Sequence, residues 1–169
     1  AMAAPGPDTG ADLAREYDLP EADEAWRQAA ATFARDVLAP TVQEADRDGH
    51  MAPTIIPGLG GAGLIGAALP AGDGGGGASM LAACLVGEEI GAVDGSARGF
   101  LAVQGGLVLA PLVKYGTDDQ KSAWAGPLMR GEAVGACALT EPEAGCDLGA
   151  MRTTIREDGD DVVIDGEKV

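Results

Sequence analysis

The chain changes character at Ala138-Leu139-Thr140-Glu141-Pro142-Glu143-Ala144-Gly145-Cys146-Asp147, where helical patterns end and strand patterns begin. Pro142 and Gly145 are residue types that favour turns, and a turn leaves backbone N–H groups without secondary-structure partners. The Thr140 hydroxyl and two glutamates lie beside this turn. The stretch therefore predicts a corner between a helical region and a sheet, and it is also a candidate binding loop.

Residues 19–132 show helical periodicity and predict an α-helical domain. Apolar residues recur at helical spacing from Pro20 to about Asp46, and again from Ser79 to Ile90. The quartet Thr117-Asp118-Asp119-Gln120 is a capping box, which opens a helix that ends near Arg130. We therefore expect several helices packed around one core.

Several residues within these helices carry more specific expectations. Pro40 should break or bend the first helix because it has no N–H group to donate. Ser96 is a candidate cap for the helix that follows residue 95. The side of the 79–90 helix expected to face the core comprises Met80, Leu81, Cys84 and Leu85. A bend or a close approach is expected at Gly105, Gly106 and Pro111.

Residues 133–169 carry strand patterns and predict the beginning of a β domain. The expected strands are Ala133 to Thr140, Met151 to Arg156 and Val162 to Ile164, with the last two forming a hairpin around Gly159. Residues 1–18 read as a flexible N-terminal lead. The predicted fold class is mainly α, with a helical domain followed by the first strands of an incomplete β domain.

Composition narrows the class of partner and the cellular setting. The chain has 169 residues, 46% of them hydrophobic, which suffices for a sizeable core. Its formal net charge of -16 argues against nucleic acid and anionic membranes as partners, since both need clustered cations. No apolar run reaches the roughly 20 residues that span a bilayer. We expect no membrane partner.

The number and spacing of the cysteine and histidine residues do not predict a metal site. Cys84, Cys137 and Cys146 are an odd count without C-x-x-C spacing, and His50 is the single histidine. We expect no metal and a reduced, cytoplasmic setting. Cys84 is expected in the core, and His50 is expected on the surface beside a helix end.

Three other motifs favour structural interpretations. Residues 58–63 fit G-x-G-x-x-G, but Pro57 precedes them in place of a strand, so a nicotinamide site is not predicted. Residues 72–77 lack the Lys-Ser/Thr of a phosphate loop and read as a linker. Glu88 and Glu89 diverge by about 100° on a helix, so they are expected to face solvent or pair with cations.

Several segments, in order, resemble the acyl-CoA dehydrogenase family. The loop at 138–147 is similar to that family's A-L-T-E-P-x-A-G-S-D pattern, with Cys146 where Ser is usual. The further matching segments are Pro70 with Gly74 to Gly77, Glu88-Glu89, Tyr115 to Lys121, Gly131-Glu132 and Val163 to Lys168. The matches cover roughly residues 20–169, and they correspond to the family's N-terminal helical domain and the first strands of its middle β domain.

The resemblance implies FAD as cofactor. It implies that backbone N–H groups around Leu139 and Thr140, with the Thr140 hydroxyl, donate to the N1/O2 edge of the flavin. Gly145 and Cys146 complete the implied cofactor site, although a thiol is a weaker donor than the usual hydroxyl. The structural alternative is a corner that Pro142 and Gly145 set and that binds nothing.

The resemblance also implies a substrate region at Val103, Gln104 and Leu107, which correspond to the floor of the family's acyl pocket. Core packing is the alternative for each residue taken singly. The implied reaction is FAD-dependent α,β-dehydrogenation of an acyl thioester carried by coenzyme A or by a carrier protein. In the family, the catalytic base belongs to a C-terminal helical domain, so no catalytic residue is assigned here.

We expect the chain alone to bind little or no FAD, and to need a second chain or a homo-oligomer partner. Two alternatives stay open. One is a catalytically incomplete binding or scaffold relative of the family, and the other is a flavin oxidase or monooxygenase of the same fold. The complete L-T-E-P element favours the dehydrogenase lineage over the monooxygenase.

Overall fold

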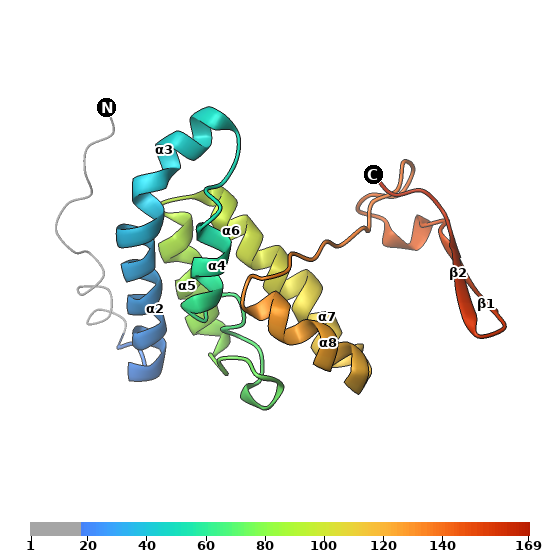
Figure 1. Ribbon diagram of the computed structural model, residues 1–169, viewed down its shortest axis with the longest axis horizontal. Helices are drawn as coiled ribbons and strands as arrows, with labels where there is room; N and C mark the ends of the chain where they lie inside the picture. The colour runs from blue at the N-terminus through green and yellow to red at the C-terminus, as the bar shows by residue number, and fades with distance from the viewer. Residues whose placement is uncertain (1–17) are drawn as a thin grey trace. The chain divides into compact units, whose positions relative to one another are not determined.

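The computed structural model describes residues 18–169, and all of the expected N-terminal lead (residues 1–18) except its last residue lies outside them. The chain divides into two compact units, unit 1 ending at Gly135 and unit 2 running from Ala136 to Val169. Unit 1 is helical, and its α-helices are α2 (Glu21–Phe33), α3 (Ala39–Asp48), α4 (Ile55–Gly61), α5 (Met80–Gly91), α6 (Gly95–Leu101), α7 (Ala110–Tyr115) and α8 (Asp118–Met129) (Figure 1). The predicted mainly helical fold is confirmed.

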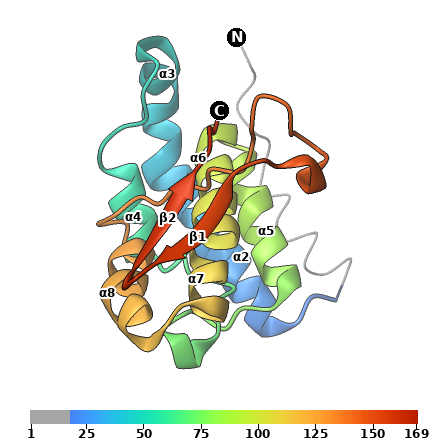
Figure 2. The ribbon, with the colours of Figure 1, turned by 90° about the vertical axis from the view of Figure 1, so that its right-hand side faces the viewer.

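The core of unit 1 is built from aliphatic side chains and alanines. Helix α2 packs against α5, and α5 packs against α6 (Figures 1 and 2). The most buried aliphatic members of the core are Ala30, Leu38, Ile55, Leu59, Ile90, Ala97 and Leu109. Alanines in this cluster let neighbouring helices approach closely, which suits a chain with only 4% aromatic residues.

Two of the helices pass through π-helical segments that end just before a proline. Segment η1 (Ala34–Leu38) joins α2 to α3, and η3 (Ala102–Leu109) joins α6 to α7. In each, a backbone N–H donates five residues back, from Ala39 to Ala34 and from Ala110 to Gly105. The wider turn moves carbonyl groups away from the ring of the proline that follows. Pro40 therefore widens its helix and does not break it.

The same effect makes one long apolar helix from Gly95 to Tyr115. It has 21 residues, and by length and composition alone it could cross a membrane. The expectation that no apolar run reaches that length was wrong, because the π segment carries the helix through its glycines and proline. Ala97, Gln104 and Leu109 of this helix are fully buried within unit 1, whereas only 17% of its apolar 18-residue window is buried. Core helices of soluble proteins pass the same test, and the absence of a membrane partner stays a prediction.

The buried side of α5 differs from the expected one. Ala82, Val86 and Ile90 face the core, spaced four residues apart. Met80, Leu81 and Cys84 are exposed, so the prediction of Cys84 as a core residue was wrong. The sequence offers apolar residues on both sides of this helix, and its pattern alone does not select between them.

The helix caps follow local sequence closely. The Thr117 capping box is confirmed, since Gln120 N–H donates to Thr117 Oγ1 at 3.2 Å and Thr117 N–H donates to Gln120 Oε1 at 2.9 Å. Ser96 is not a cap. Asp94 takes that position, and its Oδ1 accepts from Ser96 N–H at 2.7 Å.

Gln104 connects η3 to the chain that follows α8. Its side chain is fully buried, and its Nε2 donates to the carbonyls of Leu128 at 3.1 Å and Ala133 at 3.0 Å. Its Oε1 accepts from Gly135 N–H at 3.0 Å. A Cβ at residue 135 would lie 2.3 Å from Val108 Cγ1, so this close approach requires glycine. One buried amide thus bonds to a carbonyl in the last turn of α8 and to two backbone groups of the irregular chain that follows it.

Unit 2 contains a two-stranded antiparallel sheet, β1 (Thr154–Asp158) and β2 (Asp161–Asp165), in which Asp158 pairs with Asp161. Gly159 has φ +68° in the two-residue turn, so the predicted hairpin is confirmed. The predicted strand at 133–140 was wrong. Among the residues described, no strand pairs with it, and a strand pattern without a ladder partner does not make a strand.

We predict that Gln104→Leu lowers the free energy of unfolding by about 2–4 kcal/mol, because it leaves the half-buried Ala133 carbonyl and Gly135 N–H unpaired and takes one of two donors from the Leu128 carbonyl. Urea unfolding of the whole chain, followed by far-ultraviolet circular dichroism, measures this change. Gln43→Leu, on the exposed surface of α3, is the matched control and should change stability little. Equal losses for the two variants would contradict the role assigned to the Gln104 amide.

Candidate functional site

The loop at 138–147 is closed by a pair of backbone hydrogen bonds. Glu141 N–H donates to the Ala144 carbonyl at 2.9 Å, and Ala144 N–H donates back to the Glu141 carbonyl at 3.1 Å. Pro142 and Glu143 form the tip between them. Gly145 follows the tip without a positive φ, and a Cβ there would meet no atom within 4 Å. Pro142 therefore shapes this turn, while Gly145 leaves open space beside it.

The carboxylate of Glu141 holds the loop to the rest of unit 2. It accepts from Arg152 N–H at 2.6 Å, from Thr153 N–H at 3.0 Å and from Lys168 Nζ at 2.9 Å. Its side chain is 6% exposed. Hydrogen bonding from Arg152, then from Thr153 and Lys168, lowers the pKa of Glu141 from 4.5 to about 2.

Glu141 was not predicted as a positioning residue. Its partners lie 11 to 27 residues further along the chain, so no local pattern reports them. One sequence signal was present. Glu141, at the start of the turn, and a lysine at the end of the strand region are the two halves of an ion pair.

Two carbonyl groups of the loop are also engaged. Lys168 Nζ donates to the Leu139 carbonyl at 3.0 Å, and Val169 N–H donates to the Thr140 carbonyl at 2.9 Å. In the part of the chain that the structure describes, the N–H groups of Leu139 and Thr140 and the Thr140 hydroxyl make no hydrogen bond. The loop thus keeps its acceptors occupied and leaves donors available on its exposed surface.

The other predicted cofactor residues lie on the same loop. Gly145 and Cys146 are exposed, and their N–H groups also make no hydrogen bond among residues 18–169. The structure therefore places all four candidates, Leu139, Thr140, Gly145 and Cys146, on one short loop that Glu141 anchors.

The predicted substrate residues lie in unit 1, on η3, and they separate into two groups. Val103 and Leu107 are four residues apart on one exposed helical face. Gln104 is buried, and both its amide hydrogens are given to backbone carbonyls. Only Val103 and Leu107 are therefore available to contact another molecule.

The remaining sequence motifs take structural positions. Residues 58–63 lie on or just after α4, where a Cβ at Gly60 would lie 2.2 Å from the backbone of Arg130. Glu89 forms a salt bridge with the buried Arg27, as expected for a residue that pairs with a cation. His50 is exposed just after the end of α3, as predicted.

Known proteins share both the helical unit and the loop region. The family model for the acyl-CoA dehydrogenase N-terminal domain matches residues 20–132. Short-chain specific acyl-CoA dehydrogenase from mouse mitochondria is 36% identical over 155 residues, covering 91% of this chain and 37% of that protein. A 3-(aryl)acrylate reductase from Clostridium sporogenes is 36% identical over 148 residues, covering 88% and 39%.

Solved structures agree with these relatives. Glutaryl-CoA dehydrogenase from Mycobacterium smegmatis, in complex with FADH2, superposes with a TM-score of 0.84 at 28% identity, covering 91% of this chain and 40% of that one. Butyryl-CoA dehydrogenase from Megasphaera elsdenii superposes with a TM-score of 0.75 at 32% identity, covering 84% of this chain and 38% of that one.

The helical unit is thus the N-terminal domain of an acyl-CoA dehydrogenase fold. The chain belongs to the acyl-CoA dehydrogenase family, and it spans about two-fifths of the length of the relatives that it matches.

We predict that the amide chemical shifts of Arg152 and Thr153 titrate with a midpoint near pH 2. Because the folded pKa of Glu141 lies below its ordinary value of 4.5, its stabilisation is complete above that value and is lost as the pH falls through about 2. Nuclear magnetic resonance spectra of the chain between pH 6 and pH 1 measure the midpoint. A midpoint near 4.5 would show that the carboxylate is not held as described.

We also predict that Glu141→Gln loosens the loop at neutral pH, because a neutral amide accepts fewer hydrogen bonds and cannot pair with Lys168. Amide hydrogen exchange at Arg152 and Thr153 should accelerate by roughly tenfold or more. Glu143→Gln is the matched control, since its ion pair with Arg152 is exposed and contributes little. Similar acceleration in both variants would contradict the role of the Glu141 carboxylate as the anchor of the loop.

Proposed function

We propose that this chain is part of a flavoprotein that catalyses FAD-dependent α,β-dehydrogenation of an acyl thioester. The observation that carries the proposal is the set of unpaired donors on the Glu141-anchored loop. Family membership supports it, as does the bound FADH2 in the Mycobacterium smegmatis relative. The donors belong to Leu139 and Thr140, which are exposed and make no hydrogen bond within the described residues.

These donors suit one edge of a flavin. When bound, FAD supplies the acceptor for the hydride that a dehydrogenation removes. Backbone N–H groups and the Thr140 hydroxyl stabilise negative charge on the N1/O2 edge, and Glu141 fixes them before any ligand arrives. Preorganised donors lose little free energy to reorganisation, so the anchored loop favours the reduced cofactor.

The substrate side of the proposal rests on Val103 and Leu107. Their exposed apolar face on η3 fits contact with the acyl chain of a thioester whose handle is coenzyme A or a carrier protein. The catalytic base is proposed to come from sequence or a partner outside this chain. Since the candidate cofactor residues are all exposed and the chain spans about two-fifths of its relatives, we propose that further FAD contacts come from a second chain or a homo-oligomer.

A titration of FAD into the purified chain, alone and with a candidate partner chain, tests the proposal. The flavin absorption band at about 450 nm should be weak with the chain alone and strong with the partner. A strong band from the chain alone would overturn partner dependence. No band in either case would overturn flavin binding and leave a scaffold that keeps the fold.

Thr140→Val tests the loop itself in whichever assembly binds FAD. Removal of the hydroxyl should weaken the binding of oxidised FAD about fivefold and the binding of reduced FAD about tenfold or more. The effect is larger for reduced FAD because a hydrogen bond to a charged acceptor contributes more. Thr154→Val, on the exposed hairpin of the same unit, is the control and should leave both affinities unchanged. Equal effects on the oxidised and reduced forms would contradict the assigned edge.

A further inference from the structure

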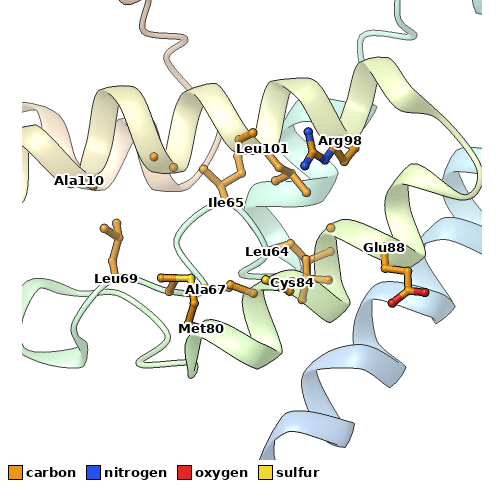
Figure 3. Close-up of a pocket in the computed structure, with 17 residues that line it drawn as sticks. Leu64, Ile65, Ala67, Leu69, Met80, Cys84, Glu88, Arg98, Leu101 and Ala110 are labelled. Atoms are coloured by element: carbon orange, nitrogen blue, oxygen red, sulfur yellow. The ribbon is translucent and has the colours of Figure 1, made fainter. Parts of the chain in front are cut away.

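Unit 1 contains a cleft of about 660 Å³ between α5 and the α6–η3–α7 helix, with residues 64–69 as its floor (Figure 3). Its walls are largely apolar, and they include Leu64, Leu69, Met80 and Leu101. Neither Val103 nor Leu107 lines it, so the cleft is distinct from the face proposed for the acyl thioester.

The charged side chains of the cleft gather at one end. Figure 3 shows Arg98 on α6 and Glu88 on α5 at that end, and Leu69 and Met80 toward the other. Both charged residues are exposed, and they do not form an ion pair with each other. The cleft therefore has one polar end and one apolar end.

Arg98 differs from the other arginines among residues 18–169. Each of those has a carboxylate partner: Arg27, Arg35, Arg47, Arg130, Arg152 and Arg156. Arg98 has none, although the chain has 27 acidic residues to 11 basic ones. Its stem lies over Gly91, where an added Cβ would be 3.2 Å from Arg98 Cγ. A guanidinium left unpaired beside an apolar cleft is suited to an anion from outside the chain.

The dimensions of the cleft favour a slender ligand. From Met80 to Glu88 the helix rises about 12 Å, which matches an extended chain of about ten bonds. Spread over that length, 660 Å³ gives a mean cross-section of roughly 55 Å², whereas a helix with side chains needs about 80 Å² or more. An extended alkyl chain can lie within this space, whereas a helix of a partner protein would stand partly outside it.

We propose that this cleft binds a linear aliphatic carboxylate of about ten carbons, with its carboxylate on Arg98 and its chain along α5 toward Leu69. The carboxylate of Glu88 at the same end repels each negative charge on the ligand, so a head group with one charge is favoured over a head group with two. This site requires no flavin and stands independently of the proposed function.

Cys84 gives a direct readout because it is exposed and lines the cleft. In a Cys137→Ser/Cys146→Ser variant, decanoate should slow alkylation of Cys84 by N-ethylmaleimide in a saturable way. Calorimetric titration of decanoate into the unaltered chain should give the same dissociation constant. Decanol should bind at least tenfold more weakly, and butyrate should not protect.

Arg98→Gln should weaken decanoate binding about tenfold or more, and Glu88→Gln should tighten it severalfold. Lys121→Gln is the matched control, since Lys121 also has no ion pair among residues 18–169 and does not line the cleft. Gly106→Leu should abolish binding without loss of helical circular dichroism, because a Cβ there meets no atom within 4 Å and the side chain fills the cleft.

Two results would overturn the proposal. Equal binding of decanol and decanoate, or unchanged binding in Arg98→Gln, would show that the carboxylate does not bind to Arg98. If no aliphatic ligand protects Cys84 and no heat of binding is measured, the cleft is not a binding site for such ligands. Neither result bears on FAD binding by the loop in unit 2, so this proposal and the proposed function fail separately.

Discussion

The buried carboxylate of Glu141 is the interaction on which unit 2 depends. Among residues 136–169, only Glu141 and Ala144 are buried, so this unit has almost no apolar core. The carboxylate draws together the loop, the start of the hairpin and Lys168. An isolated two-stranded hairpin is marginal in water. Hydrogen bonds to Glu141 therefore hold unit 2 together, whereas side-chain packing holds unit 1 together. These hydrogen bonds also set the shape of the candidate cofactor loop.

The sequence predicted those features whose causes are local. The Thr117 capping box, the hairpin at Gly159 and the turn at Pro142 depend on a few neighbouring residues, and all three were found. The family was also recognisable, because the motif of the candidate loop is contiguous. In patterns of this kind, the residues that interact lie within about four positions of one another in the sequence.

Features with distant partners were missed. Gln104 was a candidate substrate residue with core packing as its alternative; the bonds from its amide to backbone groups 24 to 31 residues away were not predicted, because its helical spacing gave no sign of them. Cys84 was placed in the core because α5 has apolar residues on both sides, and only the packing of α2 shows which side is covered. The predicted strand at 133–140 failed for a similar reason, since a strand is defined by its neighbour.

The π segments affect how this chain tolerates changes in length. A π turn contains one residue more than an α turn, so the helix from Gly95 to Tyr115 already holds an extra residue between its ends. Deleting one residue within 102–109 would return that stretch to α geometry and leave the faces of α6 and α7 in phase. The same deletion in α5 would rotate Ile90 out of the core by about 100°. Relatives that differ in length within this helix can therefore keep identical packing on either side of the difference.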